Sequence, residues 1–395
     1  MASAGTRRAR DARWRAAADI LAEVRRRPGV TRAEVARLLD ITSGSATEIA
    51  ARLRDLRLLS EAPAPPRGRG RPTSVLEAHP DGPLVLAADL RQEDWRCAIA
   101  SLDGRIRLVG SGRHRSRRPD SVLAAMRAAV DAARRRHGRR LRAVSLAVAG
   151  TVRDDRLVQA STLGWGAVDL TALTAGTSLP LLIGNDATLA GVAEARTGAA
   201  SGARTVLHLL VEVGIGGALV LDGRPFTGAR GSAGEYGHVP LGDRARRCPC
   251  GALGCWDLEV DGRGLAHRLG EPAPADPRTY ARRVIDRAAT DPTAAKAVAA
   301  VVTALGSGVA GLVNADDPDV VTLGGLAVSL RAAAGRTFDA AYAAGLMTFR
   351  RAQPPPVVDA AHGDDGALHG AAAVGLDHIT SEAELAAWAD RVRRA

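Results

Sequence analysis

The chain contains few cysteines, and it starts without an apolar leader. Four cysteines in 395 residues are too few for the disulfide framework of small secreted proteins. The N-terminus, MASAGTRRARDARW, is basic but no apolar run follows it, so no secretory signal is evident. The longest uncharged stretch, residues 297–313, is mostly Ala, Gly, Ser and Val and falls short of the ~20 strongly apolar residues of a membrane span. We therefore expect a cytoplasmic protein with no membrane insertion, in which residues 297–313 form a buried helix.

Lysine is almost absent, because Lys296 is the only one in the chain and the other basic residues are arginines. The net charge is +11, and it is concentrated at the N-terminus. Up to Pro72, sixteen Arg stand against eight Asp and Glu, which accounts for +8 of the total. An arginine excess can reflect a GC-rich coding bias as well as phosphate contacts. Basicity alone is therefore weak evidence for nucleic-acid binding.

Hydrophobic periodicity predicts three helices near the N-terminus, over residues 14–27, 31–39 and 43–59. Thr31 and Glu34 have the spacing of a capping box at the start of the second helix. Two short helices joined by a tight turn, the second beginning with small polar residues, are typical of a helix-turn-helix whose recognition helix enters the major groove. A three-helix bundle that binds a protein is the alternative.

The segment 67-RGRGRP-72 favours DNA, because it lies where the wing of a winged helix would be. Its arginines could contact phosphates or enter a narrow minor groove. A flexible linker is the other interpretation, since residues 62–70 have a suitable composition. The candidate DNA-binding residues are Ser43, Gly44, Ser45, Thr47, Glu48, Arg52, Arg69 and Arg71.

From about Leu84 onward, short apolar strands alternate with Ala-rich helical runs such as residues 122–135. This alternation predicts an α/β region with parallel sheet components. Cys97 falls in one of the strands and is expected to be a buried apolar residue. The strands are expected at residues 84–90, 97–104, 141–150, 181–187, 205–223 and 319–325.

Three of the four cysteines, Cys248, Cys250 and Cys255, lie within eight residues. In a reducing compartment, such a cluster binds metal or performs redox chemistry more often than it forms disulfides. Tetrahedral zinc requires four nitrogen or sulfur donors, so one ligand is missing from the cluster. A reduced thiol cluster without metal is the alternative.

A series of motifs in a fixed order resembles the ROK family of sugar kinases and sugar-responsive repressors. The resemblance runs from about Leu84 to the C-terminus and implies an actin-like fold of two α/β lobes with a sugar in the cleft. A helix-turn-helix in front is a feature of the family's repressors and is absent from its kinases. The motifs are Gly150, 163-LGW-165, 185-NDA-187, 214-GIGG-217, 231-GSAGEYGH-238, 248-CPCGALGC-255 and 323-LGG-325.

The resemblance implies three domains. We expect a winged helix-turn-helix with its wing and linker in residues 1–75. A first α/β lobe is expected in residues 82–187, completed by a C-terminal helix over 373–395. The second lobe, with the zinc site, is expected in residues 188–372.

The resemblance also implies the site residues. His238 would supply the fourth ligand of one structural Zn²⁺, together with Cys248, Cys250 and Cys255. Asp257 stands where the family usually has Glu, and Glu259, two residues further on, is the alternative for that role. Thr162 replaces the family's Asn before Leu-Gly-Trp, which leaves the identity of the sugar open. The sugar-binding residues would be Asn185, Asp186, Glu235, His238 and Asp257.

One loop departs from the kinases of the family. Their first strand leads into an Asp-x-Gly-Gly-Thr-Lys loop that cradles phosphate with backbone N–H groups, whereas this chain reads 89-DLRQEDW-95. The glycines and the lysine are missing, and Glu93 and Asp94 would repel ATP phosphates. Asp186 matches the kinase base but is expected only to bind sugar, and 214-GIGG-217 is equally well explained as a turn between strands.

These observations predict a repressor and not an enzyme. Its partners would be an inverted-repeat operator and a sugar or sugar phosphate effector, and it would form a homodimer or homotetramer. A ROK-type sugar kinase with an added DNA-binding domain is the alternative. A scaffold that binds another protein has no positive support in the sequence.

Overall fold

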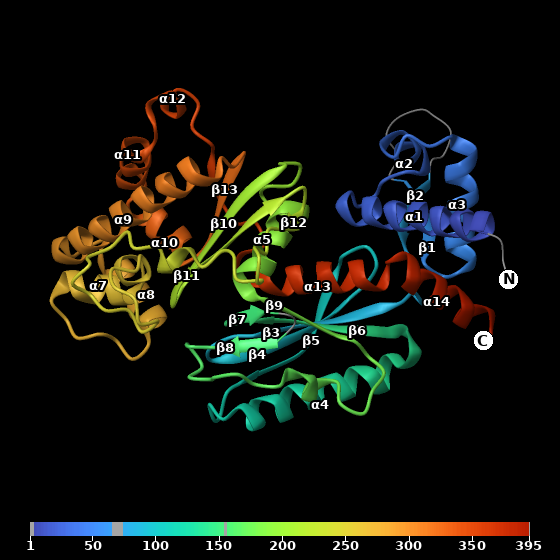
Figure 1. Ribbon diagram of the computed structural model, residues 1–395, viewed down its shortest axis with the longest axis horizontal. Coiled ribbons are helices and arrows are strands. Elements are labelled where there is room, and N and C mark those ends of the chain that lie inside the picture. Colours follow the sequence, from blue (N-terminus) through green and yellow to red (C-terminus); the bar gives the residue numbers. More distant parts are fainter. Residues whose placement is uncertain (1–3, 65–73, 154–155, 395) are drawn as a thin grey trace. The chain divides into compact units, whose positions relative to one another are not determined.

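The computed structural model describes residues 4–64, 74–153 and 156–394, which form two compact units (Figure 1). Unit 1 comprises Met1–Ala147, Asp169–Ile183 and Ala371–Ala395. Unit 2 comprises Val148–Val168 and Gly184–Gly370.

Unit 1 begins with three helices and a hairpin, namely α1 (Ala4–Arg26), α2 (Arg32–Leu38), α3 (Ser43–Asp55), β1 (Leu59–Pro63) and β2 (Ser74–Ala78). The capping box of Thr31 and Glu34 is confirmed. The third helix is shorter than predicted, because Arg57 adopts φ +54° and the chain turns into β1. β1 and β2 pair antiparallel from Leu59 opposite Ala78 to Pro63 opposite Ser74. The segment that joins them, with Arg69 and Arg71, lies outside the described residues.

The remainder of unit 1 is built on a sheet with strand order β5-β4-β3-β6-β9. The expected strand at residues 84–90 is confirmed as β3, and Cys97 is fully buried in β4. Helices α4 and α13 lie on opposite sides of the sheet (Figure 1). The elements are β3 (Leu84–Leu90), β4 (Asp94–Ala100), β5 (Ile106–Arg113), α4 (Pro119–His137), β6 (Leu141–Val148), β9 (Leu181–Asn185), α13 (Gly366–Ile379) and α14 (Glu382–Arg393).

Unit 2 contains a second sheet, of order β12-β11-β10-β13-β14, in which β10 pairs antiparallel with β11 and parallel with β13. Two antiparallel strands, β7 (Thr151–Arg153) and β8 (Arg156–Gln159), form a separate hairpin. The other strands are β10 (Thr205–Glu212), β11 (Gly214–Leu221), β12 (Arg224–Pro225), β13 (Val320–Gly325) and β14 (Val357–Asp359). The helices are α5 (Asp186–Thr197), α6 (Asp257–Val260), α7 (Gly262–Leu269), α8 (Pro277–Arg287), α9 (Pro292–Asp316), α10 (Leu326–Ala333), α11 (Gly335–Gly345) and α12 (Thr348–Arg351).

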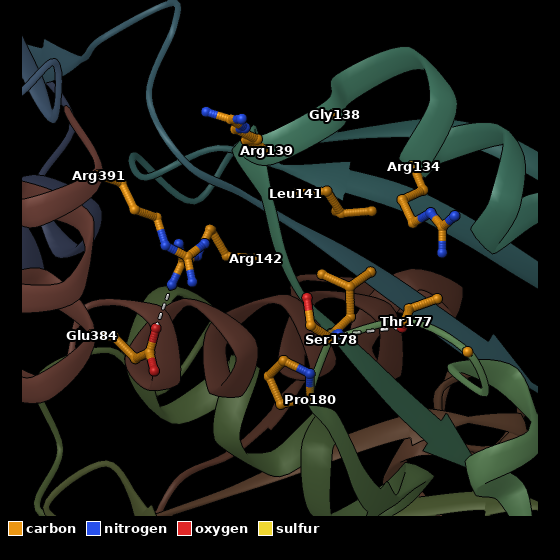
Figure 2. A pocket seen from close by; sticks show the side chains of 12 residues that line it. Arg134, Gly138, Arg139, Leu141, Arg142, Thr177, Ser178, Pro180, Glu384 and Arg391 are labelled. Carbon is orange, nitrogen blue, oxygen red and sulfur yellow. Dashed lines mark hydrogen bonds and ion pairs between the residues drawn. The ribbon is translucent and has the colours of Figure 1, made fainter. Parts of the chain in front are cut away.

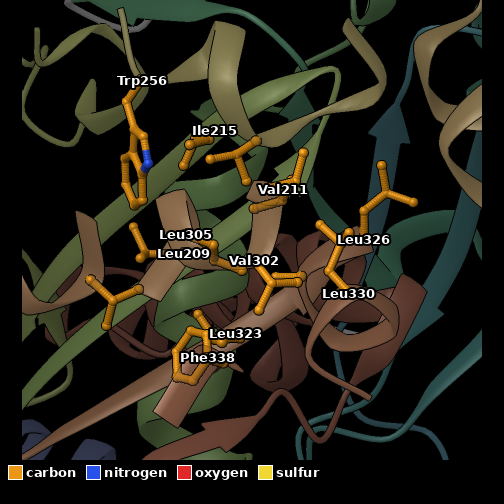
Figure 3. Packing of buried hydrophobic residues seen from close by; sticks show 14 of the residues in the cluster. Leu209, Val211, Ile215, Trp256, Val302, Leu305, Leu323, Leu326, Leu330 and Phe338 are labelled. Carbon is orange, nitrogen blue, oxygen red and sulfur yellow. The ribbon is translucent and has the colours of Figure 1, made fainter. Parts of the chain in front are cut away.

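The core of unit 2 packs β10 and β13 against α9 and α11 (Figure 3). Trp256, Leu305 and Phe338 are among its fully buried members. Helix α9 contains the expected buried stretch 297–313; it is long and apolar enough to cross a membrane, but 61% of its most apolar window is buried within unit 2. It is therefore a core helix of this unit.

Candidate functional site

Four potential metal ligands of unit 2 converge: His238, Cys248, Cys250 and Cys255. Their ligand atoms all lie within 4.8 Å of one another. The sulfurs of Cys250 and Cys255 are 3.6 Å apart, and Cys248 Sγ is 3.9 Å from His238 Nδ1. Two Zn–S bonds of ~2.3 Å at a tetrahedral angle would separate their sulfurs by about 3.8 Å. The donor set and its spacing therefore fit a tetrahedral zinc ion, whereas a disulfide would need sulfurs ~2 Å apart.

The loop that carries the cysteines is held by its own backbone. Gly251 and Gly254 adopt φ +97° and +73°, which bulkier residues rarely do. The backbone N–H of Gly251 donates to the carbonyl of Cys248 at 2.9 Å. At the base of the loop, the Arg246 guanidinium donates to Glu259 Oε1 at 2.9 Å and to the Leu258 carbonyl at 2.7 Å. These contacts hold the loop in which the three thiols converge.

Asn185 and Asp186 lie where β9 ends and α5 begins. Asn185 is the N-cap of α5, and its Oδ1 accepts from the Thr188 backbone N–H at 2.9 Å. Its Nδ2 donates to Asp186 Oδ1 at 3.0 Å and to the Gly150 carbonyl at 3.1 Å. The amide thus orients the Asp186 carboxylate and ties it to the chain at Gly150.

His238 lies between two carboxylates. Its Nδ1 is 3.6 Å from Asp257 Oδ2 and also faces the thiols, while its Nε2 is 4.0 Å from Glu235 Oε2. Glu235 accepts a hydrogen bond from Thr151 Oγ1 at 3.3 Å. Gly150 and Thr151 therefore connect the Asn185–Asp186 pair with Glu235 and His238 in one polar cluster. In the sequence, Gly150 stood only as one position of the motif series, and the contacts of Gly150 and Thr151 had no signal in the pattern.

Asp257 is turned toward the backbone. Its Oδ1 accepts from the Ile215 N–H at 2.7 Å, and only 7% of the residue is exposed. Burial raises the pKa of this carboxyl, and the neighbouring His238 counteracts the rise. Glu259 instead pairs with Arg246 and Arg268, at 2.9 and 2.7 Å. Of the two acids, Asp257 is the one beside His238.

The segment 214-GIGG-217 is the start of β11 and directly follows the turn at Val213. Gly214 has φ +100°, and a Cβ on Gly216 would lie 2.6 Å from the Cβ of Ala187. Glycine at position 216 therefore permits α5, which carries Asp186, to approach the strand closely.

At the other end of the chain, the first residues of α3 are exposed. Thr42 is the N-cap, and its Oγ1 accepts from the Ser45 backbone N–H at 3.1 Å. Arg52, two turns further on, places its guanidinium 4.3 Å from the ring centre of Trp14. The exposed residues at the start of α3 are Ser43, Gly44, Ser45, Thr47 and Glu48.

The ROK family model matches residues 85–378, three quarters of the chain. The chain belongs to the ROK family. A MarR family model matches residues 15–70, within the winged helix. The chain spans about half the length of the first curated relatives it matches. Among them, a glucokinase of Streptomyces coelicolor is 30% identical over 40% of this chain and 50% of its own length. An N-acetylgalactosamine kinase of Shewanella is 36% identical over 36% of this chain and 49% of its own.

Solved structures share the fold. A ROK family transcriptional regulator, described as a homologue of the Escherichia coli MLC protein, aligns with a TM-score of 0.75 over 96% of this chain and 99% of its own, at 19% identity. A ROK hexokinase of Thermus thermophilus aligns with a TM-score of 0.60 over 75% of this chain and 99% of its own, at 30% identity. The alignment with the regulator covers nearly the whole chain and includes the N-terminal helices. The alignment with the hexokinase covers three quarters of the chain and leaves one quarter unmatched.

Ion pairs join residues on the two sides of the loop that follows β3. Asp89 is buried and pairs with Arg96 at 3.0 Å. Arg91 makes two hydrogen bonds to Asp94, of 2.7 and 3.0 Å, and its backbone N–H donates to the Asp94 carbonyl at 2.9 Å. Burial raises the pKa of Asp89, while Arg91 and Arg96 act in the opposite direction. Two ion pairs and one backbone hydrogen bond therefore close this loop.

Proposed function

We propose that the protein is a transcriptional repressor whose binding to an operator is controlled by a sugar or sugar derivative bound in unit 2. The observation that carries the proposal is the combination, in one ROK chain, of an N-terminal winged helix and a first-strand loop closed by ion pairs. The winged helix supplies a DNA-binding element, and the closed loop argues against ATP binding at the usual place.

The sugar site that we propose is the polar cluster around Gly150. Carboxylates and amides bind vicinal hydroxyls well, because each can accept or donate two hydrogen bonds in one plane. Asp186 and Glu235 would accept from sugar hydroxyls, and Asn185 would hold Asp186 in place. Asp257 would act indirectly, by holding the Gly214–Ile215 turn and facing His238. These roles combine the contacts described above with the family pattern.

A Zn²⁺ at the His238 and cysteine cluster would stabilise this site. With Nδ1 on the metal, the His238 Nε2 would carry the proton and point it toward Glu235, which fixes the imidazole for a sugar hydroxyl. The metal would thus be structural, and it would affect sugar binding only through the side chain of His238.

The test uses labelled DNA from upstream of the protein's own gene, with complex formation followed by fluorescence anisotropy. We expect tight binding to an inverted repeat by a dimer or tetramer, and a shift of affinity on addition of one sugar from a panel of monosaccharides and their phosphates. Light scattering of the free protein measures its mass and therefore shows whether it is a dimer or a tetramer. DNA binding that no sugar affects would contradict the proposed control.

A sugar kinase with an added DNA-binding domain is the second candidate, favoured by Asp186 at the position of the kinase base. The curated relatives described above are kinases, over their matched halves. ATP turnover with the same sugar panel separates the two. Turnover that depends on both the sugar and Asp186 would establish the kinase, whereas sugar binding without turnover supports the repressor.

A further inference from the structure

An arginine-lined cavity of about 540 Å³ lies in unit 1, and no residue of the proposed sugar site lines it (Figure 2). Its walls come from α4, the start of β6, the segment 176–180 and α14. Four arginines line it, Arg134, Arg139, Arg142 and Arg391, and one acid, Glu384. The size is that of a site for a small organic molecule, since such pockets span roughly 300–1,000 Å³.

Arg142 is the buried member of this group. Its side chain is only 6% exposed, and its Nη2 donates to Glu384 Oε2 at 2.6 Å. Its Nη1 is buried and has no hydrogen-bond partner among the residues that the structure describes. A buried guanidinium N–H without an acceptor is costly, and such groups normally have a protein or solvent partner. Arg142, which lines the cavity, therefore has an N–H group that no acceptor among the described residues uses.

The surrounding charge favours an anion. Within the described part of the chain, no ion pair joins Arg134, Arg139 or Arg391 to an acidic side chain, so Glu384 is the acid that offsets the four arginines. Burial lowers the pKa of Arg142, the contact with Glu384 raises it again, and the positive charge of Arg391 lowers it further. Figure 2 shows the guanidinium groups of Arg142 and Arg391 next to each other, beside Glu384. A ligand with two or more negative charges would relieve this repulsion.

We propose that this cavity binds a small phosphate monoester, with the phosphate between Arg142 and Arg391 and the organic part toward Arg134 and Ser178. Arginine suits phosphate because its planar fork donates two parallel hydrogen bonds. A bare phosphate ion would leave most of the volume empty, whereas a phosphorylated sugar or similar metabolite would fill more of it. A DNA backbone is a poor occupant, because Arg142 is too buried for a duplex to reach.

The cavity adjoins the contact between the winged helix and the C-terminal helix. Glu384 and Trp388 lie one turn apart on α14, and the Arg142 guanidinium is 5.9 Å from the Trp388 ring centre. Trp388 Nε1 donates to the carbonyl of Leu56, the C-cap residue of α3, at 2.8 Å. A phosphate that competes with Glu384 for Arg142 would therefore disturb α14, whose Trp388 contacts the end of α3, the recognition helix. The phosphate monoester would be a second effector, and it would bind in unit 1.

The test is calorimetry of the full chain with glucose 6-phosphate, inorganic phosphate and, as the uncharged control, glucose. Arg134→Gln combined with Arg391→Gln should weaken glucose 6-phosphate binding at least tenfold. The matched control combines Arg135→Gln with Arg394→Gln, which removes the same charge from the same helix and the end of α14 at exposed positions outside the cavity. All four positions are exposed, so folding should be unaffected, as circular dichroism will check.

Glucose 6-phosphate can also reach the sugar site, so the titrations are repeated in Asp186→Asn. Binding that survives there and is lost with Arg134 and Arg391 supports the cavity. Equal loss in both arginine pairs would mean general charge attraction and would overturn the proposal, as would a lack of glucose 6-phosphate binding by the wild type. Hydrogen exchange of α3 amides with and without the ligand tests the second step, and unchanged exchange at saturation would refute it.

Discussion

Replacing Trp388 with Phe should weaken the contact between the winged helix and the C-terminal helix. Trp388 is 7% exposed, and its indole N–H donates to the Leu56 carbonyl at 2.8 Å across 332 residues of sequence. Phenylalanine keeps most of the apolar contact but removes the donor, which leaves the carbonyl of a mostly buried residue without that partner. Losing one partner of a buried hydrogen bond costs ~1–3 kcal/mol, so we expect about 2 kcal/mol.

Hydrogen exchange measures this directly, because α3 amides exchange when the winged helix opens. A loss of about 2 kcal/mol corresponds to roughly thirtyfold faster exchange in α3. The control is Trp256→Phe, which removes a similar bond, from Trp256 Nε1 to the Ala304 carbonyl at 3.0 Å, inside unit 2. Unchanged α3 exchange in Trp388→Phe, or equal acceleration by Trp256→Phe, would refute the reasoning.

Three further predictions concern unit 2. Asp186→Asn should lower sugar affinity by at least tenfold with the melting temperature unchanged; calorimetry that finds wild-type affinity would remove Asp186 from the sugar site. Cys250→Ser should reduce bound zinc, measured by elemental analysis, and weaken the sugar response while operator binding persists; a wild-type protein without zinc would exclude the metal site. His208 is buried, and burial lowers its pKa to about 4. Because the folded pKa lies below the unfolded value, its contribution to stability is present above pH 6.5 and lost as pH falls toward 4, by up to about 3 kcal/mol. Denaturant unfolding at pH 7.5 and 5 measures this effect. Between these pH values, the free energy of unfolding should decrease less for His208→Asn than for the wild type. An identical decrease would show that the titration of His208 does not cause the loss of stability.

Local patterns were sufficient to predict the three N-terminal helices, the capping box and the strands β3, β6 and β13, whereas the expected strand at residues 205–223 is divided into β10 and β11. The Thr31–Glu34 box and the strand at residues 84–90 depend on neighbours in sequence, so their signals are local. The predicted third helix extended too far, because nothing in the pattern 56–59 marks the left-handed turn at Arg57. Tertiary geometry, not residue preference, ends that helix.

Contacts between distant segments had no sequence signal. The hydrogen bond from Trp388 to Leu56 and that from Thr151 to Glu235 depend on how elements pack, which periodicity does not encode. The arginine cavity is similar, since Arg134, Arg142 and Arg391 are three of many arginines in this chain. Only the fold shows that they line one cavity. The cysteine cluster could be predicted, because three of its four candidate zinc ligands lie within one short loop and are therefore close in the sequence.

The most direct test of the central claim is fluorescence anisotropy of labelled upstream DNA bound to the full chain while the sugar panel is added. The account predicts that one sugar changes the operator affinity at least fivefold, the lower end of the ~1–3 kcal/mol typical of allosteric coupling. It also predicts that this change disappears in Asp186→Asn while the affinity without sugar is kept. A chain that binds the operator identically with every sugar, or whose response survives Asp186→Asn unchanged, would contradict the claim that a sugar in unit 2 controls the winged helix.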